Sequence, residues 1–337
     1  MKNNLAPPLI YIWIGKKIPK WAFTSLCMSK KMCGLRIVLI TEKSVGKIKC
    51  IDEQYYLEDF YTPVAEIYKH EKKSVEKFRD GFWKKTTERF YVLEQFMSIY
   101  EIGSAFHAEL DNLVFNIESL YQKFNEYGSG VFSPRDANDR GIASLIYVNH
   151  VPSLKCITEF DFRKHKHIKN DMDLLGYLLA NNQSNYHSLP TESSLSNENE
   201  WNFVDYKYIN GIFDAAAIGQ YLFGADHRIL CQLISFNGFK NENLKIDLNE
   251  YQIEINLISG LSRLVYRKDS TAINLYNIHV HSKVFKQIND KRRLKNILNN
   301  INSNSFIPIS YKPIGFIVCR FKSLLLQFIR KTGLRKD

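Results

Sequence analysis

The sequence of 337 residues predicts an α/β fold in which buried, mostly parallel strands alternate with helices. Two continuous apolar runs, "PPLIYIWIG" at 7–15 and "LRIVLIT" at 35–41, are typical of strands covered on both faces. Apolar residues also recur at helical spacing within "TTERFYVLEQFMSIY" at 86–100. The length and a hydrophobic content of 45% fit one large α/β domain or two smaller ones.

The elements follow in order along the chain. The apolar run that ends at Gly15 is too short for a signal peptide and is interpreted as the first buried strand. A helix with Thr86 or Thr87 as its cap leads into a strand over 104–111. A later helix starts near Asp214 and stops at Gly224, and strand character returns at 262–267 and 272–282. The polar stretch 181–202 is expected to be a long loop, as lids and binding loops often are.

The strand over 104–111 carries two carboxylates, Glu109 and Asp111, two residues apart. Alternate side chains of a strand share a face, so Ala105, His107, Glu109 and Asp111 would lie together. Two like charges so close repel each other unless water or a cation separates them. A solvent-facing strand end is one interpretation, and a site for Mg²⁺ or Mn²⁺ that grips a diphosphate is the other.

A second polar pair, His279 and His281 in "NIHVHSKVF", is expected on one face of a strand, followed by Lys283. Imidazole suits Mn²⁺, and a lysine is a point charge for phosphate. A structural role for the two histidines is equally compatible with the pattern. His165 and His167 lie in the charged segment "RKHKHIK" and are interpreted as solvated surface.

The cysteines and the charge indicate the setting. The six cysteines are scattered without a CxxC pair, which argues against zinc and favours reduced thiols in the cytosol. The net charge of +11 resides in residues 283–337, which hold 13 basic and two acidic residues, so residues 1–282 are neutral. A nucleic-acid-binding protein would spread its basic residues over a folded face, whereas a basic tail indicates docking on an anionic surface.

The series "YIWIG", "TTERF", "AELDN", "FDAAAIGQYL" and "HVHSK" resembles bacterial nucleotide-sugar-dependent glycosyltransferases of the GT-A type, over about residues 8–285. The resemblance implies a Rossmann-like mixed sheet flanked by helices. It also implies a catalytic domain at 1–285, with a donor-binding part at about 1–115 and an acceptor part at about 116–285. Residues 286–305 are expected to be a linker, and residues 306–337 a basic amphipathic helical tail that associates with membrane.

The resemblance also implies roles for individual residues. The family's Asp-x-Asp metal element falls on Glu109 and Asp111, with Glu in the first position. A late histidine ligand falls on "HVHSK", where His281 is slightly favoured over His279. Trp13, Ile14 and Gly15 would lie against the nucleotide base. Two further donor-binding candidates are Arg89, which could instead form only an ion pair, and Lys283.

Transfer of a sugar by inversion requires a carboxylate that takes the acceptor's proton. Asp214 is the candidate for this base, and helix capping is the alternative explanation of its position. Asp205 and Asp226 are the substitutes. The sequence leaves open whether the anomeric configuration is inverted or retained.

The expected activity is transfer of a sugar from a nucleotide-sugar donor to a glycan or lipid-linked glycan acceptor, in the assembly of a bacterial capsule or lipopolysaccharide. Mn²⁺ or Mg²⁺ is the expected cofactor. The expected location is cytoplasmic, at the inner face of the membrane, without a nucleic-acid partner. A non-catalytic sugar-nucleotide-binding or adaptor protein of the same fold is the first alternative, and a basic nucleic-acid-binding protein is the second.

Overall fold

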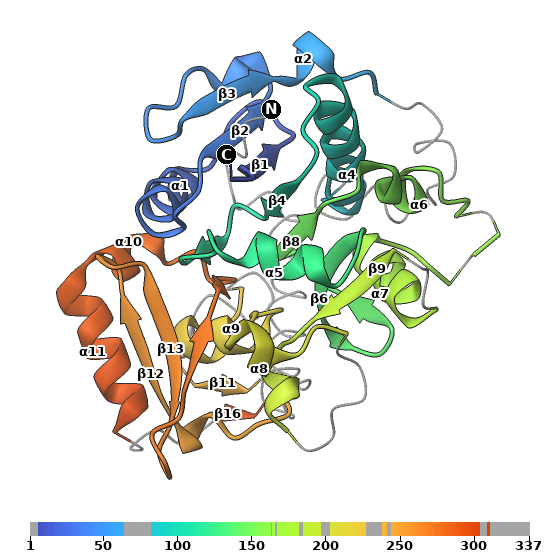
Figure 1. The fold of residues 1–337 in the computed structure, drawn as a ribbon. Helices are drawn as coiled ribbons and strands as arrows, with labels where there is room; N and C mark the ends of the chain where they lie inside the picture. The colour runs from blue at the N-terminus through green and yellow to red at the C-terminus, as the bar shows by residue number, and fades with distance from the viewer. Residues whose placement is uncertain are drawn as a thin grey trace, which may run out of the picture.

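The computed structural model describes residues 6–63, 82–162, 164–165, 167–181, 185–196, 203–226, 238–240, 244–303 and 309–310. Its centre is a mixed sheet in the order β3-β2-β1-β4-β8-β6-β7, with β9 paired to β6 (Figure 1). The strands of this sheet are β1 Leu9–Trp13, β2 Ile37–Thr41, β3 Glu53–Tyr56, β4 Ala105–Ala108, β6 Val131–Ala137, β7 Arg140–Gly141, β8 Leu145–Val148 and β9 Tyr186–Leu189.

One half of this sheet is parallel and the other half is not. The strands β3, β2, β1 and β4 all run parallel, which confirms the prediction for the two apolar runs. Strand β8 is antiparallel to both β4 and β6, so the sheet as a whole is mixed. The carboxyl ends of β1 and β4 therefore meet at one edge, where open α/β sheets usually bind ligands.

The continuous apolar runs are explained by helices on both faces. In β1, Leu9 and Tyr11 pack with Leu26 of helix α1, whereas Ile10 packs on the other face with Phe90 of helix α4. The described helices are α1 Lys20–Met32, α2 Leu57–Phe60, α4 Phe82–Ile99, α5 Leu120–Glu126, α6 Lys155–Thr158, α7 Asp171–Ala180, α8 Tyr206–Ile209, α9 Ala217–Phe223, α10 Phe285–Asn289 and α11 Lys291–Asn302. Among these described helices, none combines the length and the apolar character needed to cross a membrane.

The remaining strands build a smaller sheet and two ribbons. The smaller sheet has the order β10-β14-β13-β12, and the ribbons pair β15 with β5 and β11 with β16. A third apolar core joins this sheet to α9, α10 and α11. The strands are β5 Asn112–Val114, β10 Gly211–Ile212, β11 Phe239–Lys240, β12 Tyr251–Asn256, β13 Leu261–Tyr266, β14 Ala272–Leu275, β15 Asn277–His279 and β16 Ile309–Ser310.

The expected helix over 86–100 is present, but its expected cap is wrong. Helix α4 already includes Phe82, so Thr86 and Thr87 lie inside it. The Thr87 hydroxyl donates to the carbonyl of Trp83 at 3.1 Å, and the Thr86 hydroxyl lies 2.9 Å from the same oxygen. A threonine inside a helix can satisfy its hydroxyl in this way, so the residue type alone did not mark the start. The stop at Gly224 is confirmed, because α9 ends at Phe223 and Gly224 has φ +83°.

Two segments that were expected to be irregular contain regular structure. Within the expected loop 181–202, strand β9 pairs with β6 and a 3₁₀ turn follows over Glu192–Leu195. The expected linker 286–305 is mostly helix α10 and helix α11, and Leu294 and Ile301 of α11 are buried in the third core. Spaced apolar residues within an Asn-rich and Lys-rich segment anchor it to the body. The expected tail 306–337 lies outside the described residues apart from β16.

The cysteines differ in part from the expectation. The structure joins Cys27 of α1 to Cys50 in a disulfide, with Cα atoms 5.2 Å apart, so the expectation of reduced thiols is wrong for this pair. The two residues are 23 positions apart and form no sequence motif. They meet because α1 packs across the strands of the parallel half. Cys33 and Cys156 are free thiols.

Candidate metal centre

The two predicted carboxylates lie in a turn at the carboxyl end of β4. The strand ends at Ala108, earlier than predicted, and the amide of Asn112 donates to the carbonyl of Glu109 at 3.0 Å. The expectation that both carboxylates project from one strand face is therefore wrong. A tight turn nevertheless brings them together, and it places them at the sheet edge that is shared with the end of β1.

A ribbon from much later in the chain brings His279 to this turn. Strand β15 pairs with β5 so that His279 lies opposite Asn112. The amide of Val280 also donates to the carbonyl of Asp111, at 2.8 Å. As a result, the Nε2 atom of His279 lies 3.3 Å from Glu109 Oε2 and 3.4 Å from Asp111 Oδ2.

Glu109, Asp111 and His279 form a three-residue group whose potential ligand atoms all lie within 4.8 Å of one another. The Nδ1 atom of His279 lies 2.9 Å from the carbonyl of Ala215, which can only accept a hydrogen bond. The proton of a neutral imidazole is thereby fixed on Nδ1, and the lone pair of Nε2 faces two carboxylates. A divalent cation between these atoms would satisfy all three ligands, so the residues fit Mn²⁺ or Mg²⁺.

Behind the centre, Arg89 of α4 joins two carboxylates. Its Nη1 donates to Glu109 Oε1 at 2.6 Å, and its Nη2 donates to Asp171 Oδ2 at 2.8 Å. Asp171, at the start of α7, also accepts from the Thr86 hydroxyl at 2.9 Å. Arg89 is buried, so the surface ion pair that was left open is not what forms. Both arms of its guanidinium hold protein carboxylates, which supports a positioning role, and contact with a donor stays a prediction.

Charge governs the protonation of Glu109. Burial by itself would raise its pKa, but Arg89 and then His279 outweigh that effect and lower the pKa to about 2. Burial raises the pKa of Asp171 despite its contact with Arg89. Glu109 is therefore ionised at neutral pH and available as a metal ligand.

The predicted Lys283 also reaches the centre. Its ammonium forms an ion pair with Asp111 and lies 5.3 Å from the centroid of the Trp21 ring. Lys283 has φ +60°, in the left-handed region that is uncommon for a residue with a side chain. This backbone conformation follows the end of the β15 ribbon and directs a cation to the metal-site turn.

The second histidine, His281, occupies a different position. Its ring centroid lies 4.0 Å from that of His279, as their shared spacing predicts, but His281 is outside the three-residue group. Burial, followed by the neighbouring His279, lowers its pKa well below the usual value. The geometry therefore favours His279 as the ligand, whereas the sequence slightly favoured His281, because β15 ends at His279 and the chain turns away.

Asp214 is buried beneath the centre rather than exposed in it. Its carboxylate accepts three backbone N–H groups, those of Ile218 at 3.0 Å, Gly219 at 2.8 Å and His279 at 2.9 Å. Gly219 allows this approach, since a Cβ there would lie 2.1 Å from the carbonyl oxygen of His279. Burial raises the pKa of Asp214. This geometry matches the helix-capping alternative and adds a hold on the His279 backbone, while the base role stays a prediction.

The other predicted residues lie outside the three-residue group. Trp13 ends β1, and its indole Nε1 donates to the carbonyl of Lys17 at 3.1 Å, with Ile14 and Gly15 between them. Of the substitute bases, Asp205 caps α8 by accepting from the amide of Lys207, and Asp226 is buried. In the surface pair, His167 is exposed and His165 packs against Phe160, with ring centroids 4.9 Å apart.

Sequence reasoning missed two acidic residues here, Asp171 and Glu192. Asp171 stands in an ordinary helix start, "KNDMD", and Glu192 stands in the segment expected to be a loop. Glu192 is 1% exposed, and its Oε2 has no hydrogen-bond partner in the part of the chain that the structure describes. Burial and then Asp214 raise its pKa to about 8. Because Glu192 follows Thr191 in a polar segment, nothing in the single sequence indicates that its side chain is buried.

Comparisons with known proteins give limited information. No protein-family model matches this chain, and no curated protein matches it. Among solved structures, mouse xyloside xylosyltransferase 1 is similar with a TM-score of 0.38 and 11% identity, over 55% of this chain and 86% of that one. Two structures of the galactosyltransferase LgtC, one with donor and acceptor sugar analogs and one of an active-site mutant, have TM-scores of 0.33 and 0.35. They are 10% and 8% identical, over 55% of this chain and 74% and 73% of theirs. At these values we assign no family.

Proposed function

We propose that this protein is a metal-dependent glycosyltransferase of the GT-A type that takes a sugar from a nucleotide-sugar donor. The observation that carries the proposal is the group of Glu109, Asp111 and His279 at the carboxyl edge of the parallel strands. Two carboxylates and one imidazole suit a hard divalent ion that keeps positions open for phosphate oxygens. Three of the five short sequence motifs, "YIWIG", "TTERF" and "FDAAAIGQYL", lie outside this group and also support the proposal.

The proposed chemistry is displacement at the anomeric carbon of the donor. Positive charge develops on the sugar ring and negative charge on the departing diphosphate. Bound Mn²⁺ or Mg²⁺ would stabilise the diphosphate as a Lewis acid. Lys283, already beside Asp111, supplies a second positive charge at the same place. Arg89 keeps Glu109 ionised and oriented, and Asp214 holds the backbone of His279.

We also propose where the donor lies and what the acceptor is. The end of β1, with Trp13, Ile14 and Gly15, lies next to the end of β4 and is proposed to hold the nucleotide base. The acceptor is proposed to be a glycan or lipid-linked glycan of a growing bacterial capsule or lipopolysaccharide. Asp214 remains the proposed base for an inverting reaction, although its hydrogen bonds favour support of His279.

The activity is tested by the release of nucleoside diphosphate from a panel of nucleotide sugars, with Mn²⁺ or with a chelator. We expect Mn²⁺-dependent release by the native protein, and a loss of roughly 10²-fold or more for Asp111→Asn with the fold preserved. Glu159→Gln, at an exposed carboxylate just after helix α6, is the matched control and should keep the native rate. Donor binding without release would favour the non-catalytic sugar-nucleotide-binding alternative.

We further propose a cytoplasmic location at the inner face of the membrane, through the basic tail 306–337. Support comes from its sequence, in which Arg320, Ser323, Gln327 and Arg330 would share one stripe of a helix and apolar residues the broad remainder, as in interfacial helices. Deletion of residues 306–337 should leave Mn²⁺-dependent release unchanged and weaken cosedimentation with anionic vesicles. Undiminished cosedimentation would contradict the tail's role, and loss of the fold would show that the tail packs on the body.

A further inference from the structure

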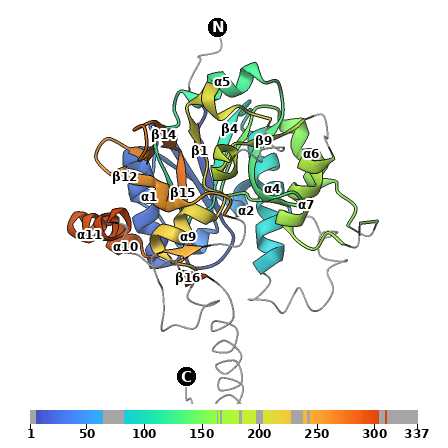
Figure 2. The ribbon, with the colours of Figure 1, turned by 90° about the horizontal axis from the view of Figure 1, so that it is seen from below.

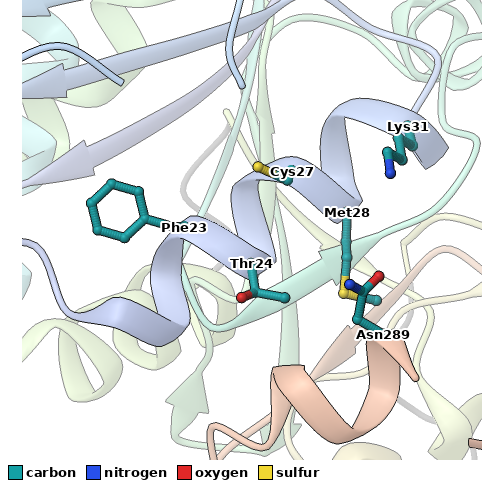
Figure 3. A pocket seen from close by; sticks show the side chains of 6 residues that line it. All are labelled: Phe23, Thr24, Cys27, Met28, Lys31 and Asn289. Carbon is teal, nitrogen blue, oxygen red and sulfur yellow. The ribbon is translucent and has the colours of Figure 1, made fainter. Parts of the chain in front are cut away.

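An apolar groove, none of whose lining residues belongs to the metal centre, lies between α1, α10 and the turn that joins β12 to β13. Figure 3 shows Met28 of α1 and Asn289 of α10 pointing toward one another across it. The groove has two adjoining parts of about 220 and 470 Å³, which share Met28, Lys31 and Asn289. The other residues that line the two parts are Phe23, Thr24, Cys27, Met32, Leu257, Ile258 and Lys291.

An isoleucine stands exposed at the rim of this groove on an ordered turn. Ile258 is 75% exposed. Its amide and that of Ser259 donate to the Asn256 side chain, at 2.9 and 3.2 Å. Gly260, with φ +65°, lies against the end of α1, where a Cβ would be 2.4 Å from the carbonyl oxygen of Met32. The turn is therefore anchored to α1 and holds an apolar side chain in solvent.

Basic residues gather next to the groove at the start of α11. Lys291, Arg292 and Arg293 occupy its first turn, which has no acidic residue, and all three are exposed. Cations at a helix N-terminus oppose the helix dipole and lower stability, so propensity does not explain them. The N-cap Asp290 already accepts from the amides of Arg292 and Arg293, so the attraction for anions comes from the side chains. The Arg293 side chain also pairs with Asp290, with Nε and Oδ2 3.6 Å apart, so Lys291 and Arg292 contribute most of this attraction. Lys31 and Lys295 are exposed as well, and Lys31 lines the groove.

We propose that this face, formed by the α1–α10 groove, Ile258 and the first turn of α11, docks on an anionic phospholipid bilayer. The cations match negatively charged headgroups, and Ile258 with Phe23 offers apolar surface to the acyl boundary. A soluble polyanion would use the cations but would gain nothing from Ile258. The inference rests on the folded body and does not require the glycosyltransferase function.

The test is cosedimentation of the full chain with vesicles of phosphatidylglycerol and phosphatidylcholine, compared with phosphatidylcholine alone. Lys291→Gln/Arg292→Gln/Arg293→Gln should lose roughly 100-fold in partitioning onto the anionic vesicles. The matched control removes three exposed lysines near α6 and α7, Lys155→Gln/Lys164→Gln/Lys169→Gln. These helices lie on the opposite side of the molecule from α11 in both views (Figures 1 and 2). The control should bind like the native protein.

A second pair of variants tests the apolar part. Ile258→Asp should weaken vesicle binding about tenfold or more, whereas Ile99→Asp, at an exposed isoleucine that ends α4, should not. Equal partitioning of the α11 variant and its lysine control would overturn the proposal. An Ile258→Asp variant that keeps native vesicle binding would also overturn it. If the residues after 303 also became sensitive to protease in that variant, the result would indicate that the chain's own tail occupies the groove. If the α11 variant lost binding to heparin, a soluble polyanion, but kept its binding to vesicles, the proposal would be overturned too.

Discussion

The turn after β4 and the turn after β9 each shield a glutamate from water, but the pKa values of the two glutamates shift in opposite directions. Glu109 faces Arg89, His279 and Lys283, and its pKa falls to about 2. Glu192 is buried near Asp214 and Asp136, and its pKa rises to about 8. Burial disfavours the charged form in both places. The cations around Glu109 reverse that effect, and the anions around Glu192 add to it.

The difference separates a charged centre from a protonated one within the same molecule. An ionised Glu109 beside Asp111 and the Nε2 atom of His279 is what a divalent cation requires. At neutral pH most Glu192 side chains carry a proton, and Oε2 has no partner among the described residues. The turn after β4 is therefore arranged to bind a cation, whereas the turn after β9 keeps Glu192 protonated. The variants below break or sharpen this contrast, beginning with the largest expected effect.

Removal of Arg89 should have the largest effect on stability. Arg89→Ala leaves the buried Asp171 and the half-buried Glu109 without their shared cation, so we expect a loss of about 3–5 kcal/mol in the free energy of unfolding. The control Arg263→Ala breaks an exposed ion pair with Glu254 and should cost at most about 1 kcal/mol. Urea unfolding of both variants measures the difference. Similar losses would show that Arg89 does not set the charge of the centre.

Replacement of Glu192 should change how stability depends on pH. The pKa of Glu192 is about 8 in the fold and 4.5 as its reference value, so between these values the folded state binds more protons than the unfolded state. Stability of the native protein therefore falls as pH rises through this window. Glu192→Gln removes that component, and its advantage over native should grow by about 3 kcal/mol from pH 5 to pH 8. An advantage independent of pH would show that Glu192 is already ionised.

Substitution of His279 and of His281 should affect Mn²⁺ affinity to different extents. His279→Ala removes an imidazole that faces both carboxylates, and we expect Mn²⁺ binding to weaken by roughly 10–100-fold. His281→Ala should change it by less than about threefold, since His281 is outside the three-residue group. The Mn²⁺-induced rise in melting temperature reports both values. The reverse order would assign the ligand to His281, as the sequence slightly favoured.

The sequence predicted the elements better than their ends. The runs at 7–15 and 35–41 were predicted to be covered strands because nearly all of their positions are apolar, and the structure covers both faces. The ends of β4 and β15 could not be predicted, because whether "HAELDN" continues as a strand or turns depends on pairing with residues 277–279, about 165 positions later. Those pairings decide which histidine meets the carboxylates.

The sequence predicted the charged residues of the candidate site, but it did not predict the buried residues that support them. Glu109, Asp111 and Lys283 stood out because charged residues followed apolar runs, and the fold brings them together. Asp171 and Glu192 look like ordinary helix-start and loop residues, and only the tertiary structure buries them. The role of Asp214 is also a tertiary matter, because the amide of His279 that it accepts lies 65 residues away.

The most direct test of the account is calorimetric titration of Mn²⁺ into the chelator-treated protein, with Asp111→Asn measured in parallel. The account predicts one Mn²⁺ per native chain, tighter binding when a nucleoside diphosphate is present, and affinity reduced by roughly 10²-fold or more in Asp111→Asn. Equal Mn²⁺ affinity in the two proteins, or no binding by the native protein with or without the diphosphate, would contradict a metal centre at Glu109, Asp111 and His279.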